Sequence, residues 1–152
     1  MTVGFVGHAF IPEEERVKAR VKEELRRHAE GVGELICYLG GYGAFDELCA
    51  RACRELKQER GGIELVYVAP YMSSAAQEKI REMEENGLYD TSVYPPIERV
   101  PLRLAVLRRN EWLVTRADLI IAYVEHRYGG AYRSLRMAEQ RKKRILNIGN
   151  LS

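Results

Sequence analysis

Short runs of β-branched and aliphatic residues alternate along this chain with longer segments whose apolar residues recur at helical spacing. The strand-like runs are Val3–Val6, Leu35–Leu39, Ile63–Ala69, Asp118–Val124 and Ile145–Ile148. The helix-like segments between and after them begin near Pro12, Phe45, Ser74, Leu102 and Tyr132. Strands that alternate with helices of this length are typical of βαβ units, in which consecutive strands run parallel.

The strand-like runs are nearly all apolar, as expected for strands that are covered on both faces. We therefore predict an α/β fold, Rossmann-like and doubly wound, with a mainly parallel sheet and helices on both of its faces. The 152 residues contain no internal repeat, which predicts a single domain over residues 1–152. The least regular segment is Asn86–Pro101, a candidate lid or linker that holds three of the five prolines.

Local signals predict where two of the helices begin. Pro12 suits a first helical turn, and Glu13–Glu15 suit the positive end of the helix dipole, so we expect the first helix to start there and to end at Gly31 or Gly33. The last helix is expected over Tyr132–Lys143, after a glycine loop.

Composition excludes some classes of protein. The 24 basic and 22 acidic residues leave a net charge of +2, which does not by itself indicate nucleic-acid binding. The odd number of cysteines and the lack of a cleavable apolar N-terminal segment argue against a secreted disulfide framework and predict a cytoplasmic protein. Cys49 and Cys53 lie one helical turn apart, where core packing is favoured over metal binding. The sequence contains no run of about 18 consecutive apolar residues, so we expect no membrane partner.

Three loops follow predicted strands and therefore meet at the carboxyl edge of a parallel sheet, where ligands bind. Their candidate ligand-binding residues are Gly7 and His8, then Gly40, Gly41, Gly43, Phe45 and Asp46, then His126, Gly129, Gly130 and Ala131. Glycine lets the backbone bring its N–H groups close to a phosphate, and a following helix adds a favourable dipole. Neither a standard dinucleotide fingerprint nor a P-loop lysine is present, so the pattern alone is weak.

Polar side chains near these loops suggest chemistry. Asp46, Glu47 and His126 are candidate catalytic residues, because a carboxylate and an imidazole can exchange protons or hold ribose hydroxyls. Asp46 has an equally simple explanation as the acidic residue of a helix N-terminus. Arg109 and Asn110 are candidate ligand-binding residues, since a guanidinium binds phosphate bidentately, although a solvated arginine is an equal alternative.

Taken together, these motifs resemble the SLOG superfamily, a Rossmann-like group that includes the DprA/Smf DNA-processing proteins and the LOG-type phosphoribohydrolases. The resemblance is strongest to the YpsA/YoqJ-like branch of bacterial and phage proteins. It rests on Gly7-His8, the stretch Gly40-Gly41-Tyr42-Gly43-Ala44-Phe45-Asp46, Tyr94-Pro95-Pro96, Arg109-Asn110-x-Trp112 and the loop from His126 to Ala131. This likeness implies a nucleotide-type ligand at the glycine loops and implies no established reaction for the branch.

One departure from the LOG-type pattern affects the expected activity. LOG-type enzymes carry a PGGxGTxxE motif with a catalytic glutamate, and the corresponding position of this chain holds Arg136. The resemblance therefore argues against phosphoribohydrolase activity and retains phosphate binding by Gly129 and Gly130.

The favoured hypothesis is a sensor or binding module for a nucleotide or a nucleotide-derived phosphate ligand, such as an ADP-ribose-like molecule, with no metal. A first alternative is a hydrolase that cleaves an N-glycosidic or phosphate-ester bond of a nucleotide. A second alternative is single-stranded nucleic-acid binding, which rests on kinship and on local arginines such as Arg133 and Arg144. A homo-oligomer is also compatible with the sequence.

Overall fold

The computed structural model describes residues 1–41, 43–70, 73–95 and 101–151, so Tyr42 and Pro96 of the motifs above lie outside the described residues. The strands of the described part are β1 (Thr2–Gly7), β2 (Leu35–Leu39), β3 (Ile63–Val68), β4 (Thr91–Val93), β5 (Leu119–Tyr123) and β6 (Arg144–Asn147). The helices are α1 (Glu14–Val32), α2 (Ala44–Arg60), α3 (Ser74–Glu85), α4 (Leu102–Arg116) and α5 (Gly129–Gln140).

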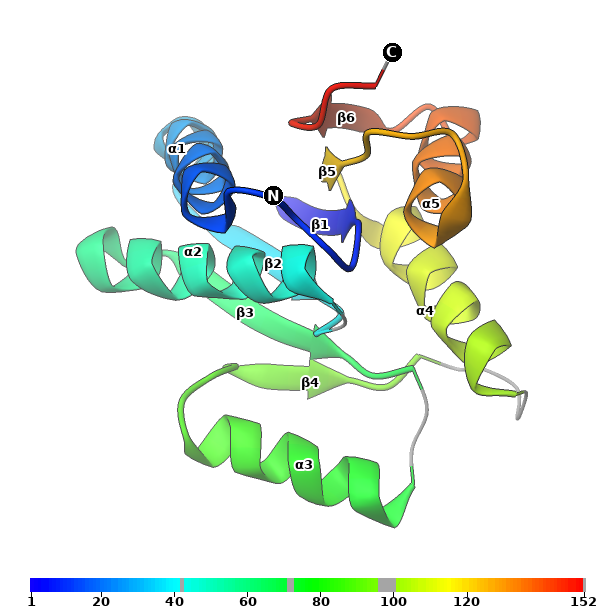
Figure 1. The fold of residues 1–152 in the computed structure, drawn as a ribbon. Helices are drawn as coiled ribbons and strands as arrows, with labels where there is room; N and C mark the ends of the chain where they lie inside the picture. Colours follow the sequence, from blue (N-terminus) through cyan, green and yellow to red (C-terminus); the bar gives the residue numbers. More distant parts are fainter. Residues whose placement is uncertain (42, 71–72, 96–100, 152) are drawn as a thin grey trace.

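The strands form one six-stranded sheet in the order β4-β3-β2-β1-β5-β6. Every neighbouring pair is parallel, which confirms the predicted Rossmann-like α/β fold. In Figure 1 the chain moves outward from β1 to β4, returns through α4, and places β5 and β6 on the other side of β1.

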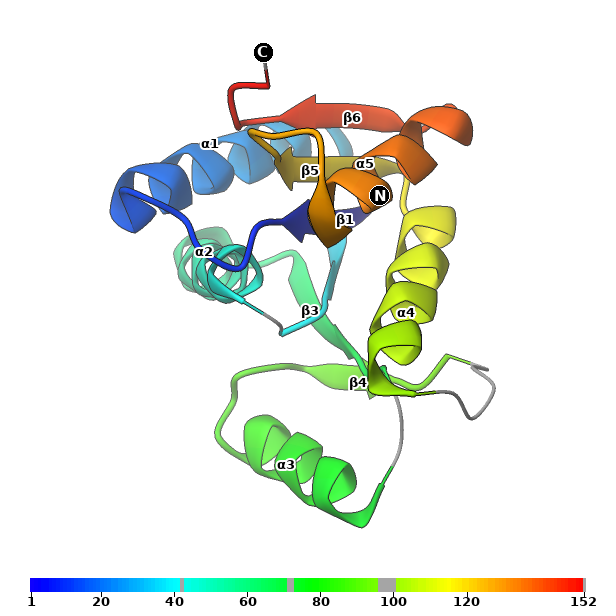
Figure 2. The ribbon, with the colours of Figure 1, turned by 45° about the vertical axis from the view of Figure 1, so that its right-hand side comes forward.

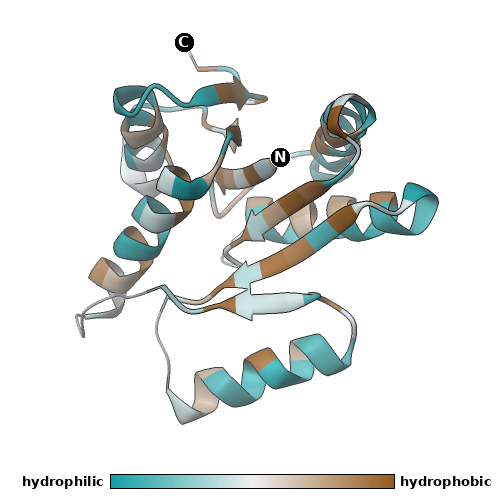
Figure 3. Ribbon diagram, turned by 180° about the vertical axis from the view of Figure 1, so that it is seen from behind, coloured by the Kyte–Doolittle hydropathy of each residue, from teal (hydrophilic) through white to brown (hydrophobic). Residues whose placement is uncertain are grey.

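Helices cover both faces of the sheet, as predicted. Figures 1 and 2 show α1 and α2 on one face, α4 and α5 on the opposite face, and α3 beside the β4 edge. Alternate strand residues feed two separate cores: Val3 and Phe5 pack with α1 and α2, whereas Val6 and Ile120 pack with α4 and α5. In Figure 3 the central strands are largely hydrophobic, whereas much of the helical ribbon is hydrophilic. Ile80 is the buried residue of α3.

Two predicted helix starts are wrong by a few residues, for local reasons. Helix α1 begins at Glu14 because Glu13 adopts a left-handed conformation (φ 53°), which leaves Pro12 in the preceding turn. The helix ends at Val32, with Gly33 at φ 89°. Helix α5 begins at Gly129, so Gly129, Gly130 and Ala131 of the second glycine loop lie in the first turn of a helix.

The segment Asn86–Pro101 was expected to be irregular, but its described part contains a strand and is held by side-chain contacts. It contains β4, which pairs with β3. Asp90 accepts a hydrogen bond from the backbone N–H of Leu65 (2.8 Å) and forms an ion pair with Lys57. The described part of this segment therefore extends the sheet.

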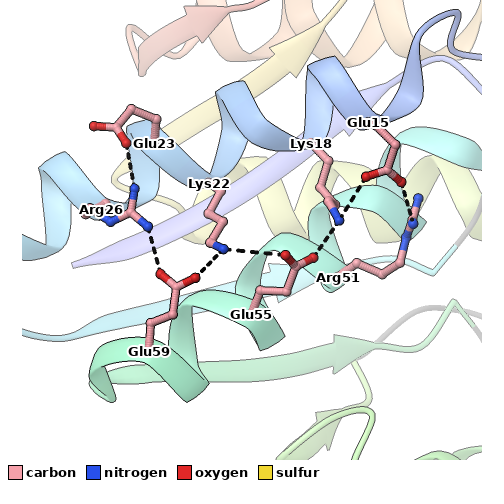
Figure 4. A network of polar contacts seen from close by, with 8 residues as sticks. All are labelled: Glu15, Lys18, Lys22, Glu23, Arg26, Arg51, Glu55 and Glu59. Carbon is pink, nitrogen blue, oxygen red and sulfur yellow. Dashed lines mark hydrogen bonds and ion pairs between the residues drawn. The ribbon is translucent and has the colours of Figure 1, made fainter.

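Helices α1 and α2 are joined along their outer sides by alternating charges (Figure 4). The network consists of Glu15, Lys18, Lys22, Glu23, Arg26, Arg51, Glu55 and Glu59. Lys18 bridges to Glu55 at 2.7 Å, and Arg26 bridges to Glu59 at 2.7 Å. Because the carboxylates of the network are exposed, the network fixes how the two helices align more than it adds stability.

Candidate ligand-binding site

The strand order reverses between β1 and β5, and in open parallel sheets this is where the loops separate and a ligand crevice opens. Hydrogen bonds hold the two loops side by side at this point. The backbone N–H of His8 donates to the carbonyl of Tyr123 (3.3 Å), and the backbone N–H of Glu125 donates to Nε2 of His8 (2.9 Å). The end of β1 and the end of β5 therefore form one continuous rim.

A cavity of about 210 Å³ lies at this rim. The residues singled out in the sequence that line it are Gly7, His8, Asp46, Arg109, Asn110, His126, Gly129, Gly130 and Ala131. Its other lining residues, which sequence reasoning missed, are Phe5, Val6, Ala9, Val106, Tyr128 and Ser134. The loops after β1 and β5, the middle of α4 and the first turns of α5 thus meet around one space.

The three glycines of the first glycine loop lie at the same sheet edge but do not line the cavity. Its first glycine, Gly40, makes room for Arg109: a Cβ on Gly40 would come within 2.7 Å of the guanidinium carbon. The Gly40 carbonyl accepts a hydrogen bond from Nη1 of Arg109 at 2.8 Å. Gly40 therefore positions a cavity residue and is not itself in contact with the cavity.

The other two glycines of this loop have packing roles. A Cβ on Gly41 (φ 64°) would meet the Tyr67 ring at 2.8 Å, and a Cβ on Gly43 (φ 92°) would meet the backbone of Ala9 at 2.8 Å. Positive φ angles of this kind favour glycine over every other residue. The loop is therefore shaped to pass close to β3 and to the loop after β1.

Phe45 and Glu47, also singled out in the sequence, lie outside the cavity lining. Phe45 is fully buried and packs against the bare backbone of Gly7, where a Cβ would clash with its ring. Glu47 is exposed on α2. The structure therefore brings Asp46 and His126, but not Glu47, to the same cavity.

Arg109 is the largest fully buried side chain of the described residues, with 2% of its surface exposed. Besides Gly40, its Nη1 donates to the carbonyl of Val68 (3.2 Å), and its Nε donates to Oδ1 of Asn110 (2.9 Å). A guanidinium that is buried and held by carbonyls keeps its planar fork in one orientation. It places a fixed positive charge in the wall of the cavity.

Helix α5 points its N-terminus at the cavity without a protein cap. Its N-cap residue, Tyr128, makes no side-chain capping hydrogen bond, and no acidic residue lies in its first turn. Gly129 (φ 87°) and Gly130 have open space where a Cβ would stand. The first N–H groups of a helix have no partner within the helix and carry partial positive charge, so this end can receive an anion.

Ser134 lies one turn further along α5 and also lines the cavity. The residue is 1% exposed, and its Oγ has no hydrogen-bond partner among the described residues. A buried hydroxyl without a partner costs about 1–3 kcal/mol, so proteins rarely keep one. One sequence signal could have located it, because residues four apart on a helix share a face and Ser134 follows Gly130 by four.

The N-terminus of α2 differs from that of α5. Asp46 and Glu47 both lie in its first turn, and Asp46 is 8% exposed while lining the cavity. A carboxylate in the first turn compensates the positive end of its own helix dipole. Of the two helices whose first turns line the cavity, α5 is therefore the one without an acidic residue in that turn.

Three rings stack at the mouth of the cavity. His8 lies on His126 (centroids 4.0 Å apart, 13° between planes), and His126 lies on Tyr128 (3.9 Å, 17°). Nδ1 of His126 donates to the Tyr128 carbonyl at 3.2 Å, which leaves Nε2 as the acceptor nitrogen of the neutral ring. Burial, and after it the charge of His126, lower the pKa of His8 below 6.5, while the Glu125 carboxylate raises it.

The described residues offer few other groups that could bind a metal or react. Among them, no group of three or more histidine, cysteine, aspartate or glutamate side chains could hold a metal ion. Cys37, Cys49 and Cys53 are free and buried, and burial is the main reason that the pKa of Cys49 lies well above its usual value. Within the described part of the chain, no helix combines the length and apolar character needed to cross a membrane.

Comparison with known proteins supports the fold of this chain and does not establish its ligand. No protein-family model matches the sequence, and no curated protein matches it. Solved structures do match. DNA processing protein A from Helicobacter pylori, in a structure that describes its single-stranded DNA binding mode, is 18% identical with a TM-score of 0.63. DNA processing protein A (DprA) from Streptococcus pneumoniae is 16% identical with a TM-score of 0.62.

These two matches cover 95% of this chain but only 63% and 48% of the DNA processing proteins, so this chain spans roughly half to two thirds of their length. The molybdenum cofactor carrier protein from Chlamydomonas reinhardtii is 12% identical with a TM-score of 0.56, over 95% of this chain and 73% of that one. At these identities the matches show that the fold is shared by proteins with different ligands.

Proposed function

We propose that this protein binds a nucleotide or nucleotide-derived phosphate ligand, with the phosphate at the N-terminus of α5. The single observation that carries the proposal is Ser134, which lines the cavity and whose buried Oγ has no partner among the described residues, on a helix whose N-cap residue makes no side-chain capping hydrogen bond. A phosphate oxygen supplies the acceptor that this hydroxyl needs. Membership of the SLOG superfamily, and of its YpsA/YoqJ-like branch, is part of the same proposal.

The arrangement around Ser134 favours an anion over a neutral ligand. Gly129 and Gly130 line the cavity in the first turn of α5, where N–H groups have no partner within the helix, and Arg109 supplies a fixed positive charge in the cavity wall. Helix N-termini of this kind bind phosphate because backbone donors and the dipole act together. Asp46, in the same cavity, is suited to accept hydroxyl groups of a sugar and unsuited to the phosphate itself.

The test uses AMP as the probe, with adenosine as its phosphate-free partner. AMP at about 100 times its Kd should stabilise the fold by about 2.7 kcal/mol, seen as a rise in Tm, and adenosine should do much less. Gly130→Asp places a carboxylate where the phosphate would lie and should abolish the shift. Gly130→Asn is the matched neutral control, since the Cβ has open space, and should retain most of it.

Two results would contradict the proposal: no shift of the wild-type protein by AMP or inorganic phosphate, or an equal shift in Gly130→Asp. The same samples, incubated with AMP and NAD and separated by chromatography, test the hydrolase alternative. Release of free base that disappears in Asp46→Asn would make the protein an enzyme and not only a binding module.

A second candidate function is single-stranded nucleic-acid binding, because one structural neighbour binds single-stranded DNA and the charges of this chain are unevenly distributed. Residues 101–152 contain eleven arginines and lysines against four acidic residues, whereas residues 1–100 contain thirteen against eighteen. Arg108, Arg133 and Arg144 are exposed in the basic part. Affinity for a fluorescent oligothymidine that falls steeply with salt and weakens in Arg133→Gln would support this function; no binding at low salt would exclude it.

A further inference from the structure

The stack of His8, His126 and Tyr128 ends in an aromatic surface that nothing described in the protein covers. His126 covers one face of the Tyr128 ring, yet Tyr128 is 69% exposed. Its other face is therefore turned to solvent. An exposed aromatic ring beside a ligand cavity offers a flat apolar face on which a ring of the ligand can stack.

The ring is held in place before any ligand arrives. The Nε2 of His8 accepts the N–H of Glu125, which fixes the inner ring, and Nδ1 of His126 donates to the carbonyl of Tyr128, which fixes the middle one. Stacking at 3.9 Å then orients the outer ring. Because these contacts already restrict the side chains, a ligand that lies on Tyr128 loses little affinity to ordering them.

The size of the cavity decides which part of a ligand reaches this ring. Cavities that enclose most of a drug-sized ligand measure about 300–1,000 Å³. The cavity here measures about 210 Å³. A ligand whose phosphate lies at α5 therefore extends out of the cavity, and Tyr128 both lines the cavity and is the N-cap residue of α5.

We propose that the exposed face of Tyr128 is a stacking platform for the nucleobase of the ligand, which rests on the phosphate site proposed above. Stacking on an aromatic face accepts every base, because each has a π-face, and it adds about 1–3 kcal/mol per base. The site therefore selects for a phosphate that carries an aromatic ring and discriminates weakly between bases. Ligands without a ring lose this part of the affinity.

The test compares AMP with ribose 5-phosphate, which keeps the phosphate and sugar but lacks the base. In the wild-type protein the ratio of the two dissociation constants, measured by calorimetry, should be about 5- to 150-fold in favour of AMP. Tyr128→Phe keeps the ring and should keep this ratio. Tyr128→Leu keeps apolar surface without a ring and should bring the ratio close to one.

Each failure has a separate meaning. If ribose 5-phosphate binds and AMP binds no tighter, or if Tyr128→Leu keeps the wild-type ratio, the platform is refuted and the phosphate site stands. If neither ligand binds the wild-type protein, the phosphate site fails and the platform fails with it. CMP and GMP, measured beside AMP, should fall within about tenfold of one another; a larger spread would indicate hydrogen-bond readout of the base.

Discussion

Replacing Ser134 by alanine should make the protein more stable and its ligand binding weaker. The Oγ of Ser134 is buried and has no partner among the described residues. An unpartnered hydroxyl costs about 1–3 kcal/mol, so its removal should raise the free energy of unfolding by about that amount. In a chain of this length each kcal/mol moves Tm by about 2–4 °C.

The chain offers a matched control that should respond in the opposite direction. Ser73 caps α3, where its Oγ accepts the N–H of Ala76 at 3.1 Å. Ser73→Ala makes the same chemical change and should lower the free energy of unfolding by about 1 kcal/mol, because it removes an N-cap. Urea unfolding of the wild type and the two variants measures both effects.

The same Ser134→Ala protein should bind AMP more weakly. A hydrogen bond to a charged phosphate contributes about 1.5–3 kcal/mol, which corresponds to a loss of about 10- to 150-fold in affinity. The reasoning is refuted if Ser134→Ala is destabilised as much as Ser73→Ala. That result would mean that Oγ has a partner in solution, such as the carbonyl one turn earlier in α5.

Three further results are expected. Gly40→Ala should lower the free energy of unfolding by about 1–3 kcal/mol, since its Cβ would lie 2.7 Å from the guanidinium of Arg109. Gly31→Ala, with open space in α1, should instead raise the free energy of unfolding by about 0.5–1 kcal/mol, and urea unfolding distinguishes the two variants. Because the pKa of His8 is lowered in the folded protein, the unfolded chain binds more protons than the folded one between that lowered pKa and 6.5. The free energy of unfolding should therefore rise with pH over this range, and His8→Asn should flatten this part of the plot of Tm against pH. Lys22→Met should lower Tm at low salt and by less at high salt, because Lys22 pairs with exposed carboxylates; an unchanged difference would show that packing matters instead.

The layout of the fold could be predicted from sequence because the periodicity of apolar residues is a local signal. Strand β5, for example, is buried at every position, and its sequence is apolar throughout. Strand β4 was missed because its three residues are each half-buried and lie between glycine and proline signals. Such a strand forms through its pairing with β3, which no local pattern records.

At the site, too, local signals could be predicted from the sequence, whereas contacts between distant residues could not. Glycine in a loop indicates that a side chain is not tolerated, but the reason depends on neighbours distant in sequence. At Gly40 a side chain would clash with the guanidinium of Arg109, which lies 69 residues later in the sequence. At Gly130 a side chain would have open space, and the residue lines the cavity. Sequence reasoning treated both as phosphate contacts. Ser134 was missed because its importance arises from burial without a partner, which is a property of the packed structure.

The cavity lining contains both positive and negative groups, and these should orient the ligand. Arg109 and the N-terminus of α5 favour phosphate, whereas the Asp46 carboxylate accepts hydroxyl groups and repels phosphate. Asp46→Asn should therefore bind inorganic phosphate more tightly and distinguish AMP less well from 2′-deoxy-AMP. These opposite changes separate a ligand contact from a helix-capping role, which would alter the stability of α2 alone. If calorimetry shows unchanged phosphate affinity and unchanged discrimination, Asp46 serves only its own helix and the proposed orientation is wrong.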